Sequence, residues 1–277
     1  MPPRPPSAGD EALQRAAFAL QSQRPDEAAR LAGELLKKSP DDLRAMQMLG
    51  TALLIQGRGK EAVAPLEQLA RRTNDPTVET QLAMALRQAG RDEDALAQFE
   101  NAIKRTPPFP PAFLELGSLL AALGRHDQAV DVLKRGLALA PMFADLSLQL
   151  GRVYATRNDH ANARAAFARA LELAPAHTDT MFALARALQN GGDFAQAADM
   201  YRRLLAVEPR DAASRIGLGI CLIELGQSDE GFASLRLAAQ TSPKMFGETL
   251  GALVSCGRGR FWLRPGDAEK FLRGKQP

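Results

Sequence analysis

The residues of this chain that could do chemistry are few and lie far apart in the sequence. Two of the three histidines, His126 and His160, stand 34 residues apart at equivalent positions. A structural zinc site takes four ligands, and the spacing supplies no third or fourth side chain to these histidines. The two cysteines, Cys221 and Cys256, also lack the spacing of metal ligands. We therefore predict that these side chains are structural and that the chain binds no metal ion.

The string GRGK at residues 57–60 has the composition of a phosphate-binding loop but not its length. Such a loop places four residues between its glycines, whereas a single residue separates Gly57 from Gly59. Catalysis also needs a nucleophile, a base and an electrophile that converge in one pocket. The sequence offers no such set, so we predict neither an enzyme nor a bound cofactor.

The composition of the 277 residues excludes several classes of protein. Hydrophobic residues make up 45% of the chain, and 35 basic residues are balanced by 32 acidic ones, unlike a disordered chain. Two cysteines are too few for a disulfide scaffold, and no stretch of about 18 residues is free of charge, as a membrane-spanning helix requires. The first residues, MPPRPPSAGDE, lack the apolar core of a secretory signal. These features favour a globular, cytoplasmic protein.

A period of 34 residues runs through most of the chain. Five prolines are spaced by 34 each time, and a series of alanines recurs with the same period except for one step of 33. A period of this length is typical of repeat proteins. The prolines are Pro107, Pro141, Pro175, Pro209 and Pro243, and the alanines are Ala28, Ala62, Ala95, Ala129, Ala163 and Ala197.

Each period has the pattern of two helices joined by a tight turn. In residues 110–143, apolar side chains recur every three or four positions on either side of Gly124, as on one face of a helix. Glycine readily adopts the left-handed conformation that ends a helix, and Asn158 takes its place in one unit. The proline after the second helix cannot continue that helix. We therefore predict helical hairpins that are stable only when stacked.

Small and large residues alternate at the positions where these helices must cross. We expect Gly151 and Ala163 to touch, because only small side chains let two helix backbones approach closely. Larger residues four positions after the small one are expected to pack between neighbouring hairpins. These are Phe99, Leu133, Phe167, Tyr201 and Leu235.

The pattern resembles the tetratricopeptide repeat family over about 235 of the 277 residues. It departs from the family in three respects: no unit carries the tryptophan typical of the first helix, the second unit ends in Asn74 and Asp75 before Pro76, and the seventh has Gly231 in place of the alanine. In the two best-matched units the signature residues are Leu150, Gly151, Tyr154, Ala163, Phe167, Ala170 and Pro175, then Leu184, Ala185, Leu188, Ala197, Tyr201 and Pro209.

The resemblance implies an all-α fold, a right-handed α-solenoid of seven helix-turn-helix repeats with a C-terminal capping helix. Residues 1–8 are expected to be a disordered, proline-rich tail. The expected repeats are 9–42, 43–75, 76–109, 110–143, 144–177, 178–211 and 212–243, followed by a degenerate eighth repeat, capping helix and basic tail at 244–277.

In the family that the chain resembles, the first helices line a concave groove. Carrying those positions across predicts that Leu13, Gln14 and Ala17 line its start, followed by Gln47, Met48 and Thr51. We expect polar side chains in the middle and an apolar patch in the last two repeats. The candidate peptide-binding residues are Gln81, Arg87, Glu115, Leu148, Gln149, Arg152, Phe182, Arg186, Ile216, Ile220 and Ile223.

These residues predict the chemistry of a ligand. An amide side chain can both donate and accept a hydrogen bond with the backbone of an extended peptide. Arg152 and Arg186 are expected to select acidic side chains or a terminal carboxylate through forked hydrogen bonds, unless Asp145 and Asp179 neutralise them. The isoleucine patch is expected to take an apolar anchor.

The final stretch, residues 257–277, contains six basic and two acidic residues. One interpretation is that its apolar side chains fold back over the open end of the solenoid, as terminal repeats must be capped. The other is that the segment docks on an anionic membrane or nucleic acid. We favour the cap, which would use Phe261, Trp262, Leu263, Phe271 and Leu272.

The sequence thus predicts a non-enzymatic scaffold or adaptor that binds an extended peptide or protein segment in its groove. Two alternatives remain. One is a targeting or specificity module for a separate catalytic partner, because members of the family are often fused to sulfotransferase or glycosyltransferase domains. The other is an anionic-surface binder that works through the basic tail. Nucleic acid and membrane are not the partners we expect, and a monomer is favoured.

Overall fold

The structure, a computed structural model, describes residues 8–256 and 265–274, and every regular element in these residues is helical. Each of the helices in these ranges is too short or too polar to cross a membrane. The elements are α1 (Ala8–Gln21), α2 (Pro25–Lys38), α3 (Leu43–Ile55), α4 (Gly59–Ala70), α5 (Pro76–Gln88), α6 (Asp92–Ala102), α7 (Pro110–Ala122), α8 (His126–Leu139), α9 (Ala144–Thr156), α10 (His160–Leu173), α11 (Thr178–Asn190), α12 (Phe194–Val207), α13 (Ala212–Glu224), α14 (Ser228–Thr241), the 3-10 turn η1 (Pro243–Met245), α15 (Phe246–Ser255) and α16 (Pro265–Leu272).

The helices from α1 to α14 form consecutive hairpins with tight turns. Each predicted turn glycine has a positive φ, such as 75° at Gly124, and Asn158 has a φ of 57°. The first hairpin turns at Gln23, whose φ is 55°, so a residue without glycine's freedom adopts the same conformation there. The start of α3 is fixed by Asp42, whose carboxylate accepts hydrogen bonds from the backbone N–H groups of Arg44 and Ala45.

Glycines in the first helices allow large side chains of the second helices to approach closely. A β-carbon at Gly151 would lie 2.5 Å from the ring of Phe167 in α10, so Phe167 is the nearest side chain to Gly151. Leu133 and Leu235 fill the same position against Gly117 and Gly219 of their own hairpins.

Tyr201 of α12 differs from these residues, because its ring packs against Gly217 of α13 in the next hairpin. Of the large residues expected to pack between hairpins, Tyr201 is therefore placed as predicted. Three others pack instead against a glycine in the first helix of their own hairpin. These are Leu133, Phe167 and Leu235.

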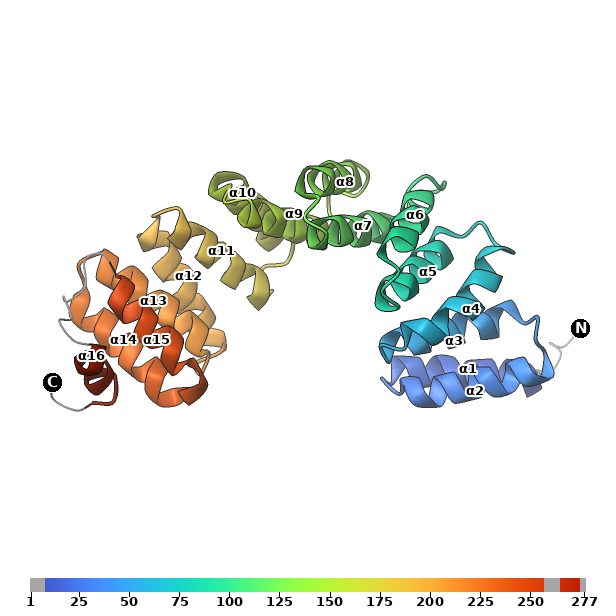
Figure 1. Cartoon of the computed structure of the whole chain (residues 1–277), viewed down its shortest axis with the longest axis horizontal. Helices are drawn as coiled ribbons and strands as arrows, with labels where there is room; N and C mark the ends of the chain where they lie inside the picture. Colours follow the sequence, from blue (N-terminus) through green and yellow to red (C-terminus); the bar gives the residue numbers. More distant parts are fainter. Residues whose placement is uncertain (1–7, 257–264, 275–277) are drawn as a thin grey trace, which may run out of the picture. The chain divides into compact units, whose positions relative to one another are not determined.

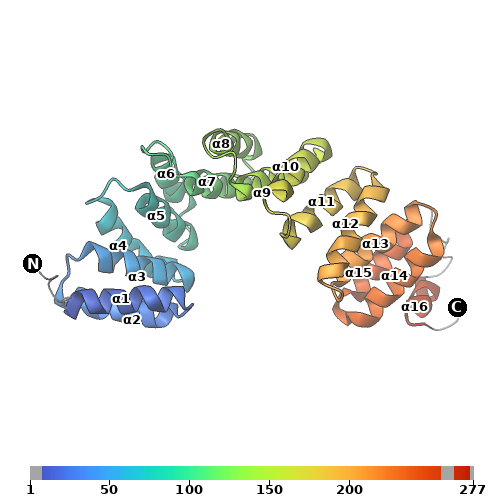
Figure 2. The same cartoon turned by 180° about the vertical axis from the view of Figure 1, so that it is seen from behind.

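The chain divides into two compact units, Met1–Pro141 and Met142–Pro277. In the first unit α1, α3, α5 and α7 contact one another in that order, and in the second unit α9, α11, α13 and α15 do the same. Figures 1 and 2 show, from opposite sides, that the helices of each unit follow one another in chain order. Within each unit the first helices of successive hairpins therefore form one continuous face.

A buried ion pair stabilises the first unit. Glu79 of α5 is only 5% exposed, and Arg105, which follows α6, donates to its carboxylate from Nε at 2.9 Å and from Nη2 at 2.5 Å. Because hydrogen bonds satisfy a buried carboxylate, this contact holds the second helix of one hairpin against the first.

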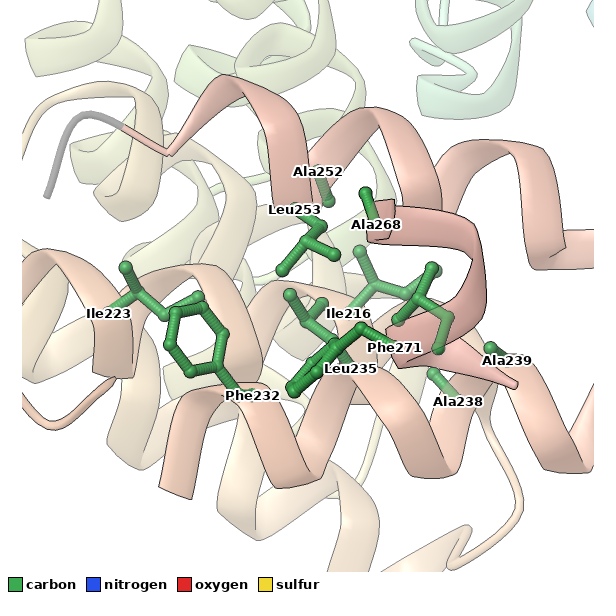
Figure 3. Packing of buried hydrophobic residues seen from close by; sticks show 11 residues of the cluster. Ile216, Ile223, Phe232, Leu235, Ala238, Ala239, Ala252, Leu253, Ala268 and Phe271 are labelled. Carbon is green, nitrogen blue, oxygen red and sulfur yellow. The ribbon is translucent and has the colours of Figure 1, made fainter. Parts of the chain in front are cut away.

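A separate helix covers the C-terminal end of the second unit. α16 packs on α14 and α15, and Figure 3 shows side chains from α13, α14, α15 and α16 pointing toward one another. Leu272 is fully buried, and the Phe271 ring stands edge-on to Phe232 with the Arg236 guanidinium 4.3 Å from its centre. The predicted cap is confirmed for Phe271 and Leu272, whereas residues 261–263 lie outside the described residues.

Candidate functional site

Two of the histidines and both cysteines lie within helices or at their ends, and His160 also lines a hollow of the second unit. His126 and His160 each begin a second helix, in different units, and both Nδ1 atoms are buried without a hydrogen-bond partner. Burial raises the pKa of the Cys221 thiol to about 12 and that of Cys256 to about 11, so both thiols remain protonated at neutral pH. In residues 8–256 and 265–274, no group of three or more His, Cys, Asp or Glu side chains could hold a metal ion.

The first unit has a hollow of about 600 Å³ between α1 and α3, which we call the N-terminal hollow. All six residues that the sequence places at the start of the groove line it. At its edge the Arg44 Nη2 atom lies 3.0 Å from the Asp10 carboxylate. The lining residues are Asp10, Leu13, Gln14, Ala17, Leu20, Arg44, Gln47, Met48 and Thr51.

Further along the first unit, the predicted polar residues contact one another or their neighbours. The Gln81 amide donates to Thr51 Oγ1 at 3.0 Å, and the Thr51 hydroxyl in turn donates to the Gln47 carbonyl at 2.9 Å. The Gln81 amide oxygen is buried and accepts no hydrogen bond in the described chain. The Gln81 side chain is therefore held by a hydrogen bond to the neighbouring helix α3.

Arg87 and Glu115 form an ion pair between α5 and α7, with 3.7 Å between Arg87 Nη1 and Glu115 Oε2. Burial raises the pKa of Glu115, and the nearby Arg87 guanidinium opposes this shift without reversing it. The arginine that was predicted to face a ligand in this unit thus already has a carboxylate partner.

The second unit has a hollow of about 570 Å³ between α9 and α11, which we call the α9–α11 hollow. The predicted site residues Arg152, Phe182 and Arg186 all line it. Both arginines are exposed, and within the part of the chain that the structure describes neither forms an ion pair. In the described residues neither Asp145 nor Asp179 forms an ion pair with them, although Asp179 also lines the hollow. The two guanidinium groups are therefore available to an anionic ligand.

Another hollow in the second unit, of about 390 Å³, shares Phe182 and Arg186 with the α9–α11 hollow and extends across α13 to α15. We call it the α11–α15 hollow. Ile216 and Ile220 line it, as predicted for an apolar anchor site, and the Arg186 guanidinium lies 5.9 Å from the centre of the Phe182 ring. Its remaining lining residues are Gln189, Tyr201, Ala213, Gly217 and Glu248.

Gln189 is held in one orientation by a buried tyrosine. Tyr201 is 1% exposed, and its hydroxyl donates to the Gln189 amide oxygen at 3.0 Å. A buried phenol needs an acceptor, and burial also raises the pKa of Tyr201, so the proton stays on this oxygen. The Gln189 amide group consequently keeps its two N–H donors for other partners, including a ligand in the α11–α15 hollow.

Ile223 is the most deeply buried of the predicted site residues, followed by Leu148 and Ile216, which are each 7% exposed. Ile223 is fully buried among the apolar side chains of α13 to α16. The reason is the close crossing of α13 and α14, where a β-carbon on Gly231 would lie 2.6 Å from Ile223 and 2.8 Å from the Gly219 carbonyl oxygen. The prediction that Ile223 presents its side chain to a ligand is therefore wrong.

Leu148 and Gln149 of α9 lie apart from the hollows described above. Leu148 is 7% exposed and Gln149 is half-buried. Their neighbour Arg152, one helical turn further on, lines the α9–α11 hollow together with Ala155 and Thr156 of the same helix. The predicted site thus divides into a first-unit set, Gln81, Arg87 and Glu115, and a second-unit set, Arg152, Phe182, Arg186, Ile216 and Ile220.

The lining of the α11–α15 hollow includes residues outside the predicted peptide-binding set, among them Gln189 and Glu248. Gln189 lies three residues after Arg186 on the same helix face. The repeat register gives no such signal for Glu248, because Gly251, which the sequence aligns with Gly117, is exposed whereas Gly117 is buried.

Sequence profiles of one family match nearly all of the repeat region. Tetratricopeptide repeat profiles match residues 80–141, 114–178 and 182–245, and a further one matches residues 19–89. No curated protein matches the chain.

Several solved structures share the fold. A thermophilic tetratricopeptide repeat protein of Thermus thermophilus is 28% identical, with a TM-score of 0.56 over 66% of this chain and 100% of the other. The C-terminal part of a tetratricopeptide-repeat-containing protein of Cytophaga hutchinsonii is 17% identical, with a TM-score of 0.67 over 87% and 99%. A chain of the APC/C hetero-tetramer Cut9–Hcn1 is 18% identical, with a TM-score of 0.65 over 88% of this chain and 49% of its own. Because the family profiles cover well over half of the residues and the helical hairpins agree, the chain belongs to the tetratricopeptide repeat family.

Proposed function

We propose that this protein is a non-enzymatic scaffold whose second unit holds an extended segment of a partner protein against the first-helix face. The tetratricopeptide repeat fold is generally a protein–protein interaction module, and this supports the general role. The observation that carries the specific role is that Arg152 and Arg186, which form no ion pair with any described residue, lie next to the apolar side chains of the α11–α15 hollow.

The charges favour an acidic ligand. An arginine without a carboxylate partner can form two parallel hydrogen bonds to a ligand carboxylate, and hydrogen bonds to a charged group are about twice as strong as neutral ones. Arg186 lines both hollows, so one ligand segment can place an acidic side chain at the arginines and an apolar one on Phe182, Ile216 and Ile220. Gln189 supplies an N–H donor for a backbone carbonyl of the same segment.

The first unit has a stretch of first-helix face of its own. Its arginines are already paired, so Gln81, Arg87 and Glu115 present a surface with little net charge. We propose that this stretch contacts neutral parts of a longer partner. The acidic part then binds the second unit.

A displayed library of random linear peptides, selected on the full-length chain, tests this function. We expect the enriched peptides to combine acidic and apolar residues. The double variant Arg152→Glu with Arg186→Glu should lose the acidic preference while its helicity and melting temperature stay nearly unchanged, because both side chains are exposed.

The matched control is Arg203→Glu with Arg210→Glu, which makes the same change in charge at two exposed arginines outside both hollows. This control should keep the acidic preference. Acidic peptides that bind the Arg152 and Arg186 double variant as well as the wild type would contradict the proposal.

A further inference from the structure

The last helix of the first-helix face carries a carboxylate at the α11–α15 hollow. The hollow and not the repeat register places Glu248 of α15 there, because Gly251 is exposed whereas Gly117, its partner in the sequence alignment, is buried. Phe182 and Ile216 line the α11–α15 hollow, and Glu248 lines it too. α15 therefore belongs to the binding face as well as to the covered end of the unit.

Glu248 has no structural role that the contacts reveal. Its side chain is exposed, and among residues 8–256 and 265–274 it forms neither a hydrogen bond nor an ion pair. Arg186 lines the same hollow but does not pair with it. The carboxylate thus remains free at one side of an apolar surface.

The two sides of this surface have opposite charge. Arg152 and Arg186 lie on α9 and α11, and their two positive charges outweigh the single negative charge of Asp179 in the α9–α11 hollow. Glu248 lies beyond α13, with the apolar side chains of Ile216 and Ile220 on the helix between. A ligand that complements this face needs charges of opposite sign on the two sides of its apolar residue.

We propose that the second unit recognises a protein segment in which an apolar residue is flanked by an acidic residue on one side and a lysine or arginine on the other. This inference rests on the proposed function, because it concerns the same groove. It adds a basic residue to the ligand and assigns Glu248 as the residue that selects it. The order of charges across the groove also fixes how the segment is oriented when bound.

The same library, selected on the full-length Glu248→Lys variant, tests the proposal. Peptides enriched on the wild type should carry acidic and basic residues on opposite sides of the apolar one. Peptides selected on Glu248→Lys should carry an acidic residue where those selected on the wild type carry a basic one. Peptides selected on Glu248→Gln should show no preference for either charge at that place. A synthetic peptide from the wild-type selection should bind Glu248→Lys about fivefold more weakly.

The matched control is Glu230→Lys, which makes the same charge change at an exposed glutamate in the first turn of α14, outside the hollow. It should leave both the selection and the affinity unchanged. If Glu248→Lys and Glu248→Gln enrich the same basic residues as the wild type, the inference is wrong.

The failure of this inference can be told apart from failure of the proposed function. Loss of the acidic preference in the Arg152 and Arg186 double variant, with no effect of Glu248→Lys, refutes only the role of Glu248. The proposed function and this inference are both refuted if the library yields no enriched peptide. They are also both refuted if the same peptides are enriched on the wild type, on the Arg152 and Arg186 double variant and on the Glu248 variants.

Discussion

The two units place arginines on the same face of their first helices, but only the first unit neutralises them. Arg44 lies 3.0 Å from the Asp10 carboxylate, and Arg87 lies 3.7 Å from that of Glu115. In the second unit Arg152 and Arg186 have no such partner among the described residues. Two stretches with the same hairpin architecture therefore offer different surfaces, one whose arginines are paired with carboxylates and one whose arginines are not.

This difference shows that the fold alone does not decide what such a face binds. An ion pair between exposed side chains contributes little stability, so Arg44 and Arg87 are not needed to hold the first unit together. Their pairing matters because it removes two positive charges from the surface. The comparison therefore concerns recognition more than stability, and substitutions can test each side of it.

The largest effect is expected where the second unit depends on a close helix crossing. Gly151→Leu should lower the free energy of unfolding by about 1–3 kcal/mol or more, because its side chain would overlap the Phe167 ring. Gly33→Leu in α2 of the first unit is the matched control, since nothing lies within 4 Å of a β-carbon there. Thermal unfolding measures both. A Gly151→Leu protein that melts with the wild type would show that the helices do not cross as described.

A smaller effect separates the paired and unpaired arginines directly. Arg87→Ala removes the partner of Glu115 and is expected to cost about 0.2–1 kcal/mol of stability at neutral pH, as for other partly exposed ion pairs. Arg152→Ala should change stability by less than about 0.5 kcal/mol, because its side chain has no partner to lose. Chemical denaturation of the two variants measures the difference. Equal losses would mean that Arg152 is also engaged in the fold.

The smallest effect concerns the pH dependence of the first unit. Burial raises the pKa of Glu115 in the folded chain. A carboxyl with a raised folded-state pKa stabilises the fold fully below its unfolded pKa, about 4.3, and this contribution is lost as the pH rises through the folded-state pKa. Glu115→Gln removes this dependence. Its melting temperature relative to the wild type should therefore be higher at neutral pH than in acid, and the opposite trend would contradict the burial of this carboxyl.

Much of the fold follows from the sequence because the repeat imposes it. The spacing of the prolines and turn glycines predicts the hairpins, and the positive φ values at Gly124 and Asn158 confirm the turns. The turn at Gln23 carries no comparable signal, because glutamine rarely adopts this conformation. The division of the chain after Pro141 is equally hidden, since the period continues through it without interruption.

The sequence predicts where the candidate site residues lie, but not whether their side chains are paired or buried. The register places Arg87 and Arg152 on the same face, yet it does not tell which of them has a carboxylate within reach, because that depends on side chains from neighbouring helices. Ile223 fails for a similar reason. Its register suits the groove, but the glycines at the α13–α14 crossing bring the helices close enough to bury it.

The most direct test compares the arginines of the two units in one binding experiment. An acidic, apolar peptide selected on the wild type is titrated calorimetrically into the full-length wild type and two double variants. Arg152→Ala with Arg186→Ala should weaken binding about tenfold or more, since each lost charge-assisted hydrogen bond costs about 1.5–3 kcal/mol. Arg44→Ala with Arg87→Ala should bind within about twofold of the wild type. Equal weakening by both, or weakening by the first-unit pair alone, would contradict the account.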